Sequence, residues 1–162
     1  MRYLLVFALA CGFFTAGAQT PSKVRRVDAY LAIRLPGTIP VDDLGGPMKK
    51  RRVDSLWTIV AETRTPKMTW GFAWRGGRTY TVAATRVTDL KVGRAKEGGA
   101  EIYRRPAAGN YLWQLELIPY EGHKKAPARV APGAILIQGK AGTTPFYRTL
   151  RTFTELDVAP SV

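Results

Sequence analysis

The chain has 162 residues, of which 46% are hydrophobic, so it is long enough for one globular domain and too short for two of ordinary size. Its 25 Lys and Arg residues outnumber 12 Asp and Glu residues and give a formal net charge of +13. With one Cys and one His, the chain lacks the residues for a zinc finger, an iron–sulfur site or a disulfide framework. We therefore expect one hydrophobic core and neither metal nor cofactor.

The first 18 residues have the organisation of a secretory signal peptide. Arg2 precedes an apolar run over residues 3–14, and the small-residue triplet Ala16-Gly17-Ala18 follows. The run is about 12 residues long, whereas a membrane-spanning helix needs roughly 20. We expect cleavage after Ala18, export to the periplasm or the extracellular space, and no transmembrane helix in the mature chain. A lipoprotein anchored through Cys11 is the alternative.

The mature chain is expected to hold a single domain. Loss of Arg2 lowers the net charge by one, to +12, and loss of Cys11 leaves no cysteine. Residues 19–26 are expected to form a polar linker, residues 27–156 a single β domain and residues 157–162 a frayed tail. Without disulfides this domain depends on its hydrophobic core, which is feasible at this length.

The first predicted strands follow the linker. Alternating apolar and polar residues predict a strand over residues 27–34, and Pro and Gly residues interrupt regular structure after it. Residues 53–62 fit either a helical stripe or an alternating strand. We favour a strand, because Thr58, Ile59 and Val60 form a β-branched triplet.

The clearest local pattern is a hairpin over residues 68–85. Two alternating runs are joined by Gly76-Gly77, a composition typical of a two-residue primed turn. This register places Arg75 opposite Arg78. One face of the hairpin then carries three aromatic residues, Trp70, Phe72 and Trp74. We interpret this face as the core side of the sheet. The alternative is a stacking platform for sugars or bases.

A loop and a second hairpin are predicted next. Residues 90–99 contain three cations and three glycines without periodicity, which predicts a mobile surface loop. Residues 101–105 and 110–118 predict a hairpin that places Glu101 and Glu116 diagonally, roughly 7–8 Å apart. Its buried face would contain Ile102, Tyr111, Trp113, Leu115 and Leu117.

The last two strands are predicted over residues 134–138 and 145–155, separated by a turn over residues 139–142. The whole pattern gives about eight strands joined by turns rich in Gly and Pro, and no helix. It predicts an all-β fold, either an antiparallel β-sandwich or a small closed β-barrel.

The sequence offers few catalytic groups. His123, the only histidine, lies beside two lysines, and no nucleophile motif surrounds Ser55, so we interpret His123 as a solvated loop residue. Glu101 and Glu116 could act as the carboxylate pair of a glycosidase, although an exposed face with salt bridges is the expected arrangement. The Asp42-Asp43 doublet falls short of a calcium site.

Basic residues gather in the predicted loops and at strand ends. If these loops lie at one end of the sheet, their cations form a rim that could bind an anionic polymer through counterion release. Otherwise the cations serve solubility and edge protection. The candidate polyanion-binding residues are Lys49, Lys50, Arg51, Arg52, Arg94, Lys96, Lys124 and Lys125.

These observations favour an exported, non-catalytic β domain that has a binding or structural role in the cell envelope. Its expected partner is an anionic glycan, lipopolysaccharide or an envelope protein, and an intracellular nucleic acid is not expected. Two alternatives remain open. The signal peptide, the strand count and the Trp and Tyr content also fit a small outer-membrane β-barrel, and the acidic pair fits a secreted carboxylate-dependent hydrolase.

Overall fold

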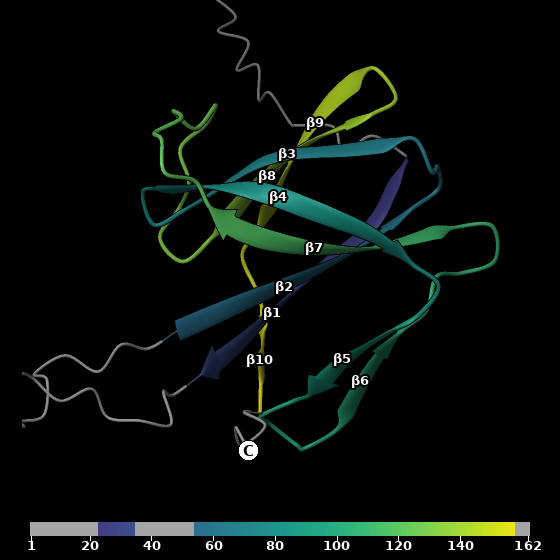
Figure 1. Ribbon diagram of the computed structural model, residues 1–162. Helices are drawn as coiled ribbons and strands as arrows, with labels where there is room; N and C mark the ends of the chain where they lie inside the picture. The colour runs from purple at the N-terminus through teal and green to yellow at the C-terminus, as the bar shows by residue number, and fades with distance from the viewer. Residues whose placement is uncertain (1–22, 35–53, 158–162) are drawn as a thin grey trace, which may run out of the picture.

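Ten β-strands and no helix occur in the parts of the chain that the computed structural model describes, residues 23–34 and 54–157 (Figure 1). No described segment is a helix long and apolar enough to cross a membrane. Several predicted features lie outside the described residues: the signal peptide, the basic run of Lys49, Lys50, Arg51 and Arg52, and the tail from residue 158.

Eight strands form one mixed sheet, in the order β10-β1-β2-β7-β4-β3-β8-β9. Neighbouring strands are antiparallel except β1 and β10, which run parallel. A separate ribbon pairs β5 with β6. The strands are β1 (Val24–Arg34), β2 (Asp54–Thr63), β3 (Met68–Arg75), β4 (Arg78–Val87), β5 (Leu90–Arg94), β6 (Glu101–Arg104), β7 (Tyr111–Pro119), β8 (Ile135–Ala141), β9 (Thr144–Leu150) and β10 (Thr154–Leu156).

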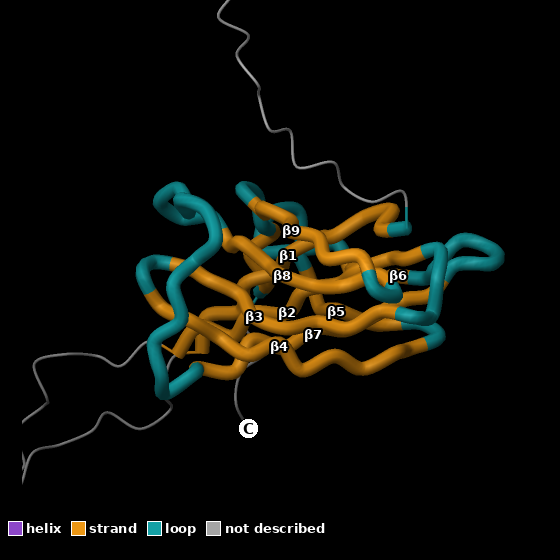
Figure 2. Tube along the Cα trace, turned by 90° about the horizontal axis from the view of Figure 1, so that it is seen from above, coloured by secondary structure: helices purple, strands orange, loops and turns teal. Residues whose placement is uncertain are grey.

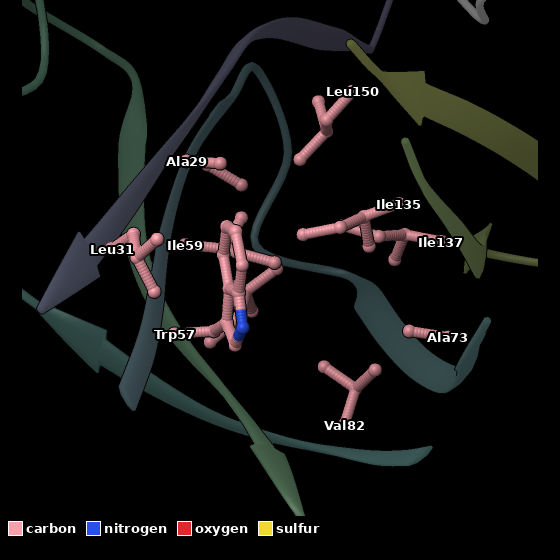
Figure 3. Packing of buried hydrophobic residues seen from close by; sticks show 11 residues of the cluster. Ala29, Leu31, Trp57, Ile59, Ala73, Val82, Ile135, Ile137 and Leu150 are labelled. Carbon is pink, nitrogen blue, oxygen red and sulfur yellow. The ribbon is translucent and has the colours of Figure 1, made fainter. Parts of the chain in front are cut away.

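The large sheet curls into a half-barrel, as the views in Figures 1 and 2 show. Its concave side encloses the main core, to which seven of the strands contribute side chains (Figure 3). Ile59 in β2, Leu115 in β7 and Ile137 in β8 are completely inaccessible to solvent. The all-β fold predicted from the alternating pattern is therefore confirmed, and so is the strand over residues 53–62.

A second core lies on the outer face of β1, β2 and β7. Tyr30, Val60 and Leu112 are buried there, although their neighbours in sequence point into the half-barrel. The β5–β6 ribbon covers this face, because Leu90 and Ile102 pack against the cluster. These central strands are therefore apolar on both faces.

The ribbon corrects two predictions. Residues 90–99 are not a mobile loop, since residues 90–94 form β5 and pair with β6. Likewise, β6 does not form a hairpin with β7, because β2 and β4 occupy both edges of β7. Of the face predicted to be buried, Ile102 packs on the outer cluster, whereas Trp113, Leu115 and Leu117 contact the main core.

The predicted β3–β4 hairpin is confirmed, but its aromatic face is not. Gly76 and Gly77 form the turn, both at positive φ, and Arg75 is opposite Arg78. The pairing of β3 with β8 shifts between Trp70 and Ala73, which is the mark of a β-bulge. The bulge turns Ala73 into the main core beside Trp70, so Trp74 projects from the opposite face.

The two ends of the described chain differ from their predicted boundaries. β1 begins at Val24, inside the predicted linker, because Val24 is buried in a small cluster with Met68 and Phe146. Asp157, the first residue of the predicted tail, is held by a 2.7 Å hydrogen bond from its N–H to the carbonyl of Arg94. The domain thus includes residues at both ends that composition alone assigned to irregular segments.

The last predicted turn is also displaced. It lies at Gly142 and Thr143, between β8 and β9, rather than over residues 139–142. Gly139 is inside β8, where an added Cβ would lie 2.6 Å from the ring of Phe146. A glycine here makes room for an aromatic ring and does not mark a turn.

Candidate functional site

The loop over residues 120–130 is fixed to the β3–β4 hairpin by hydrogen bonds. The indole Nε1 of Trp74 donates to the carbonyl of Lys124 at 2.7 Å, and the hydroxyl of Thr79 donates to the same carbonyl at 3.1 Å. The N–H of Tyr120 donates to the carbonyl of Thr79 at 3.0 Å. In Figure 1 this green loop lies beside the turn of the hairpin. The bulge in β3 thus directs the indole of Trp74 toward the loop, where its hydrogen bond fixes the loop in place.

Aromatic contacts support the same arrangement. The rings of Phe72 and Tyr120 meet edge to face at 5.5 Å, and the Lys124 ammonium lies 3.9 Å from the centre of the Phe72 ring. An added Cβ on Gly122 would lie 2.7 Å from the Tyr120 ring. The present position of this ring therefore requires a glycine at residue 122. Phe72, predicted to be in the core, therefore shapes the outer surface.

Two adjacent hollows open between the hairpin turn and the 120–130 loop, and both are bordered by Gly77 and His123. The larger, which is open to solvent, has a volume of about 530 Å³, within the usual range of ligand sites, and the smaller has about 240 Å³. Residues that line the larger hollow include Trp74, Arg75, Lys124, Lys125 and Arg129, and those that line the smaller include Arg78 and Tyr120.

The lining of both hollows is basic. Neither hollow is lined by Asp or Glu, and Glu121, although part of the loop, borders neither. No residue in the described ranges forms an ion pair with any of the five lining cations, which are Arg75, Arg78, Lys124, Lys125 and Arg129. Their charges are therefore available to an anion that enters.

Arg75 differs from the other four cations. Its guanidinium carbon lies 4.3 Å from the centre of the Trp57 ring, and Trp57 in turn meets Phe153 edge to face. The Nε of Arg75 is buried and has no hydrogen-bond partner. Packing thus holds this guanidinium in place without a counter-charge from the described residues.

The candidate cations predicted from the sequence separate into groups. Lys124 and Lys125 lie together at the larger hollow, whereas Arg94 and Lys96 belong to the ribbon, away from the hairpin turn in Figures 1 and 2. Lys96 forms a 2.7 Å ion pair with Glu155, and Arg94 lies 4.0 Å from Glu101. The four cations at residues 49–52 lie outside the described residues.

The structure separates the proposed carboxylate pair. Glu101 is in the ribbon, bonded to Lys91 and Tyr103, and these hydrogen bonds hold its pKa below the usual value. Glu116 is in β7, opposite Thr58 and Ala83. The diagonal placement predicted from the second hairpin is therefore wrong, because that hairpin does not form.

Among the residues that the structure describes, one carboxylate, that of Glu62, is buried, and its contacts explain why. Glu62 accepts hydrogen bonds from the Asn110 side chain at 2.6 Å and from the Ala107 N–H at 3.1 Å, and Arg25 lies 3.3 Å away. Burial acts to raise the pKa of Glu62, but these donors outweigh it and leave the pKa lowered. Glu62 is thus an ionised structural group that holds the loop before β7.

Sequence reasoning missed Arg75, Arg78, Arg129 and Tyr120 as members of one site. A signal was present for the bulge, because an isolated glycine, Gly71, interrupts the alternating pattern of the strand. No signal placed Arg129 beside the hairpin. Within the described ranges, no group of three or more His, Cys, Asp or Glu side chains could hold a metal ion.

Comparisons with protein-family models, with curated proteins and with solved structures give no match, so only the geometry of the site bears on function.

Proposed function

We propose that the chain is an exported, non-catalytic domain that binds an anionic polymer of the cell envelope, such as an acidic glycan or lipopolysaccharide. The observation that supports this function is the basic lining of the two hollows. Five cations converge there without a lining acid, and cations that share a cleft attract a polyanion more strongly than scattered ones. Their convergence also favours binding over a role for charge in solubility alone.

The curled sheet favours the barrel form of the predicted fold over the sandwich. The main core lies within one sheet that bends around it, with β1 and β9 in contact across the opening. In a sandwich, two separate sheets would face each other. We therefore propose a small barrel-like domain with its binding site at one end.

Export forms part of the proposal and rests on the first 18 residues. Arg2, the short apolar run and Ala16-Gly17-Ala18 predict a mature chain that begins at Gln19. Intact-mass measurement of the product from its native host should give the mass of residues 19–162. A product that retains residues 1–18, without a lipid on Cys11, would contradict export by this route.

The binding experiment compares two triple variants of the mature chain that lose equal charge. In the first, serine replaces three cations of the larger hollow, Lys124, Lys125 and Arg129. In the matched control, serine replaces three cations of the ribbon, Lys91, Arg94 and Lys96. Affinity for heparin, as a model polyanion, is measured by calorimetry at several salt concentrations.

Each neutralised charge adds about 0.7–0.9 to the slope of log affinity against log salt, so the first variant should lose roughly 2–3 from that slope. The control should keep most of the parent's slope and affinity. Equal losses in both variants would show that charge acts without a defined site. A parent that does not bind heparin at low salt would contradict the proposed function.

A further inference from the structure

The position of Arg75 is unusual for a cation. Its Nε is buried without a hydrogen bond, and the Arg75 side chain forms no hydrogen bond or ion pair with the residues of the described ranges. Removal of a charged donor from water without a partner is unfavourable, so folding alone gives no reason for this arrangement. A buried polar atom without a partner in a native structure requires an explanation, and a bound ligand supplies one.

The surroundings of Arg75 pack its guanidinium against an aromatic ring at the border of the larger hollow. The guanidinium carbon lies 4.3 Å from the centre of the Trp57 ring, and Trp57 is itself buried and meets Phe153 at 5.1 Å. Arg75 also borders the larger hollow, together with Lys124 and Arg129. This contact restricts the side chain before a ligand binds, which lowers the entropy lost on binding.

We propose that Arg75 anchors one oxyanion group of the polymer, a carboxylate, sulfate or phosphate, within the larger hollow. This inference rests on the proposed function and specifies its chemistry. A guanidinium donates two parallel hydrogen bonds to an oxyanion, a geometry that an ammonium cannot reproduce. Electrostatic attraction to the polymer that does not depend on orientation then comes from Lys124, Lys125 and Arg129.

The test substitution keeps the positive charge of the side chain and changes the geometry of its hydrogen-bond donors. Arg75→Lys retains the cation but loses the paired donors, so affinity for a heparin tetrasaccharide should fall about tenfold or more. The slope against salt should stay unchanged, because no charge is removed. The matched control is Arg94→Lys, which makes the same change in the ribbon, where Arg94 lines neither hollow, and should bind like the parent.

Three probes separate the possible oxyanions: the heparin tetrasaccharide, which carries sulfates and carboxylates, an oligogalacturonate, which carries only carboxylates, and a short polyphosphate. The probe with the largest loss in Arg75→Lys identifies the group that Arg75 binds. If Arg75→Lys binds every probe as tightly as the parent, the anchor is overturned while the proposed function stands. A parent that binds none of the probes overturns both.

A second measurement uses the unaltered mature chain and so does not depend on the folding of a variant. Phenylglyoxal modifies accessible guanidinium groups, and mass spectrometry of the digested protein gives the extent of modification at each arginine. Saturation with the probe that binds best should protect Arg75 at least fivefold, while Arg94 in the ribbon keeps its reactivity. Equal modification of Arg75 with and without the probe would overturn the anchor.

Discussion

The ribbon and the hairpin end of the sheet are both rich in cations, but they differ in how those cations are compensated. Around the ribbon, Lys91 pairs with Glu101, Lys96 with Glu155, and Arg104 lies 3.2 Å from Asp28. At the hairpin end, the five cations around the two hollows have no ion pair within the described residues. Basic residues thus produce a largely neutralised surface in one region and a positive hollow in the other.

The difference shows why net charge alone does not locate a site. An acidic residue beside each cation cancels its field beyond a few ångströms, and the pair itself adds little to stability when exposed. Cations without acidic neighbours repel one another, which opposes folding unless a ligand compensates them. A polyanion therefore gains the most electrostatic binding energy at the hairpin end, whereas the cations of the ribbon are already paired with acidic residues.

The largest expected effect is at the indole that fixes the hairpin end. Trp74→Ala should lower the free energy of unfolding by about 3–5 kcal/mol, because it removes a buried aromatic side chain together with the hydrogen bond to Lys124. Heparin affinity should fall as well, since the 120–130 loop carries three of the cations. Urea unfolding and calorimetry measure the two effects.

Trp74→Phe separates packing from the hydrogen bond. It keeps most of the ring volume and loses the donor to the Lys124 carbonyl, so we expect a stability loss of about 1 kcal/mol. If Trp74→Ala costs no more than Trp74→Phe, the indole contributes only its hydrogen bond. In that case the position of the loop would not depend on packing of the buried ring.

The next effect concerns the compensated side of the molecule. Glu62→Gln should lower stability at pH 7 by about 1–3 kcal/mol, since charge-assisted hydrogen bonds from Asn110, Ala107 and Arg25 act on the carboxylate. The folded state lowers the pKa of Glu62 from its ordinary 4.5. Its contribution is therefore complete above that value and is lost as pH falls through the lower folded pKa.

Urea unfolding at pH 7 and at several values below 4.5 measures this dependence. The parent should lose the advantage over Glu62→Gln as the solution is acidified, and heparin binding by the folded variant at pH 7 should match the parent. A constant difference between the two proteins down to pH 2 would mean that ionisation of Glu62 does not contribute to the fold.

Much of the fold could be predicted from the sequence because the alternating pattern is local. Alternation predicted most of β1, the β-branched triplet at residues 58–60 favoured a strand at β2, and the Gly76-Gly77 turn predicted both the β3–β4 hairpin and its register. The pairing of β6 with β5 could not be predicted in this way. An apolar residue such as Ile102 fits both a strand that pairs with β7 and a strand that covers the outer cluster. The second arrangement forms because β2 and β4 occupy both edges of β7.

The candidate site was less predictable, because its assembly depends on one bulge and one distant loop. Without the bulge, Trp74 would share a face with Trp70 and would not reach Lys124. Lys124 and Lys125 were identified from charge alone, and Arg75 was seen only as part of a turn. Its significance comes from Trp57 and from the lack of a counter-charge, and both depend on contacts distant in sequence.

The smallest expected effect gives the sharpest comparison between the two regions. Lys96→Ser and Lys124→Ser each remove one exposed cation, so both variants should have melting midpoints close to that of the parent. The charge removed at residue 96 is already compensated, because Glu155 lies 2.7 Å away and raises the pKa of Lys96 through its hydrogen bond and charge. Heparin affinity should therefore hold in Lys96→Ser and fall in Lys124→Ser, with a salt slope lower by about 0.7–0.9 in the second variant only. Calorimetry at two salt concentrations is sufficient, and an equal fall in both variants would show that the ion pairs of the ribbon do not shield its cations from a polyanion.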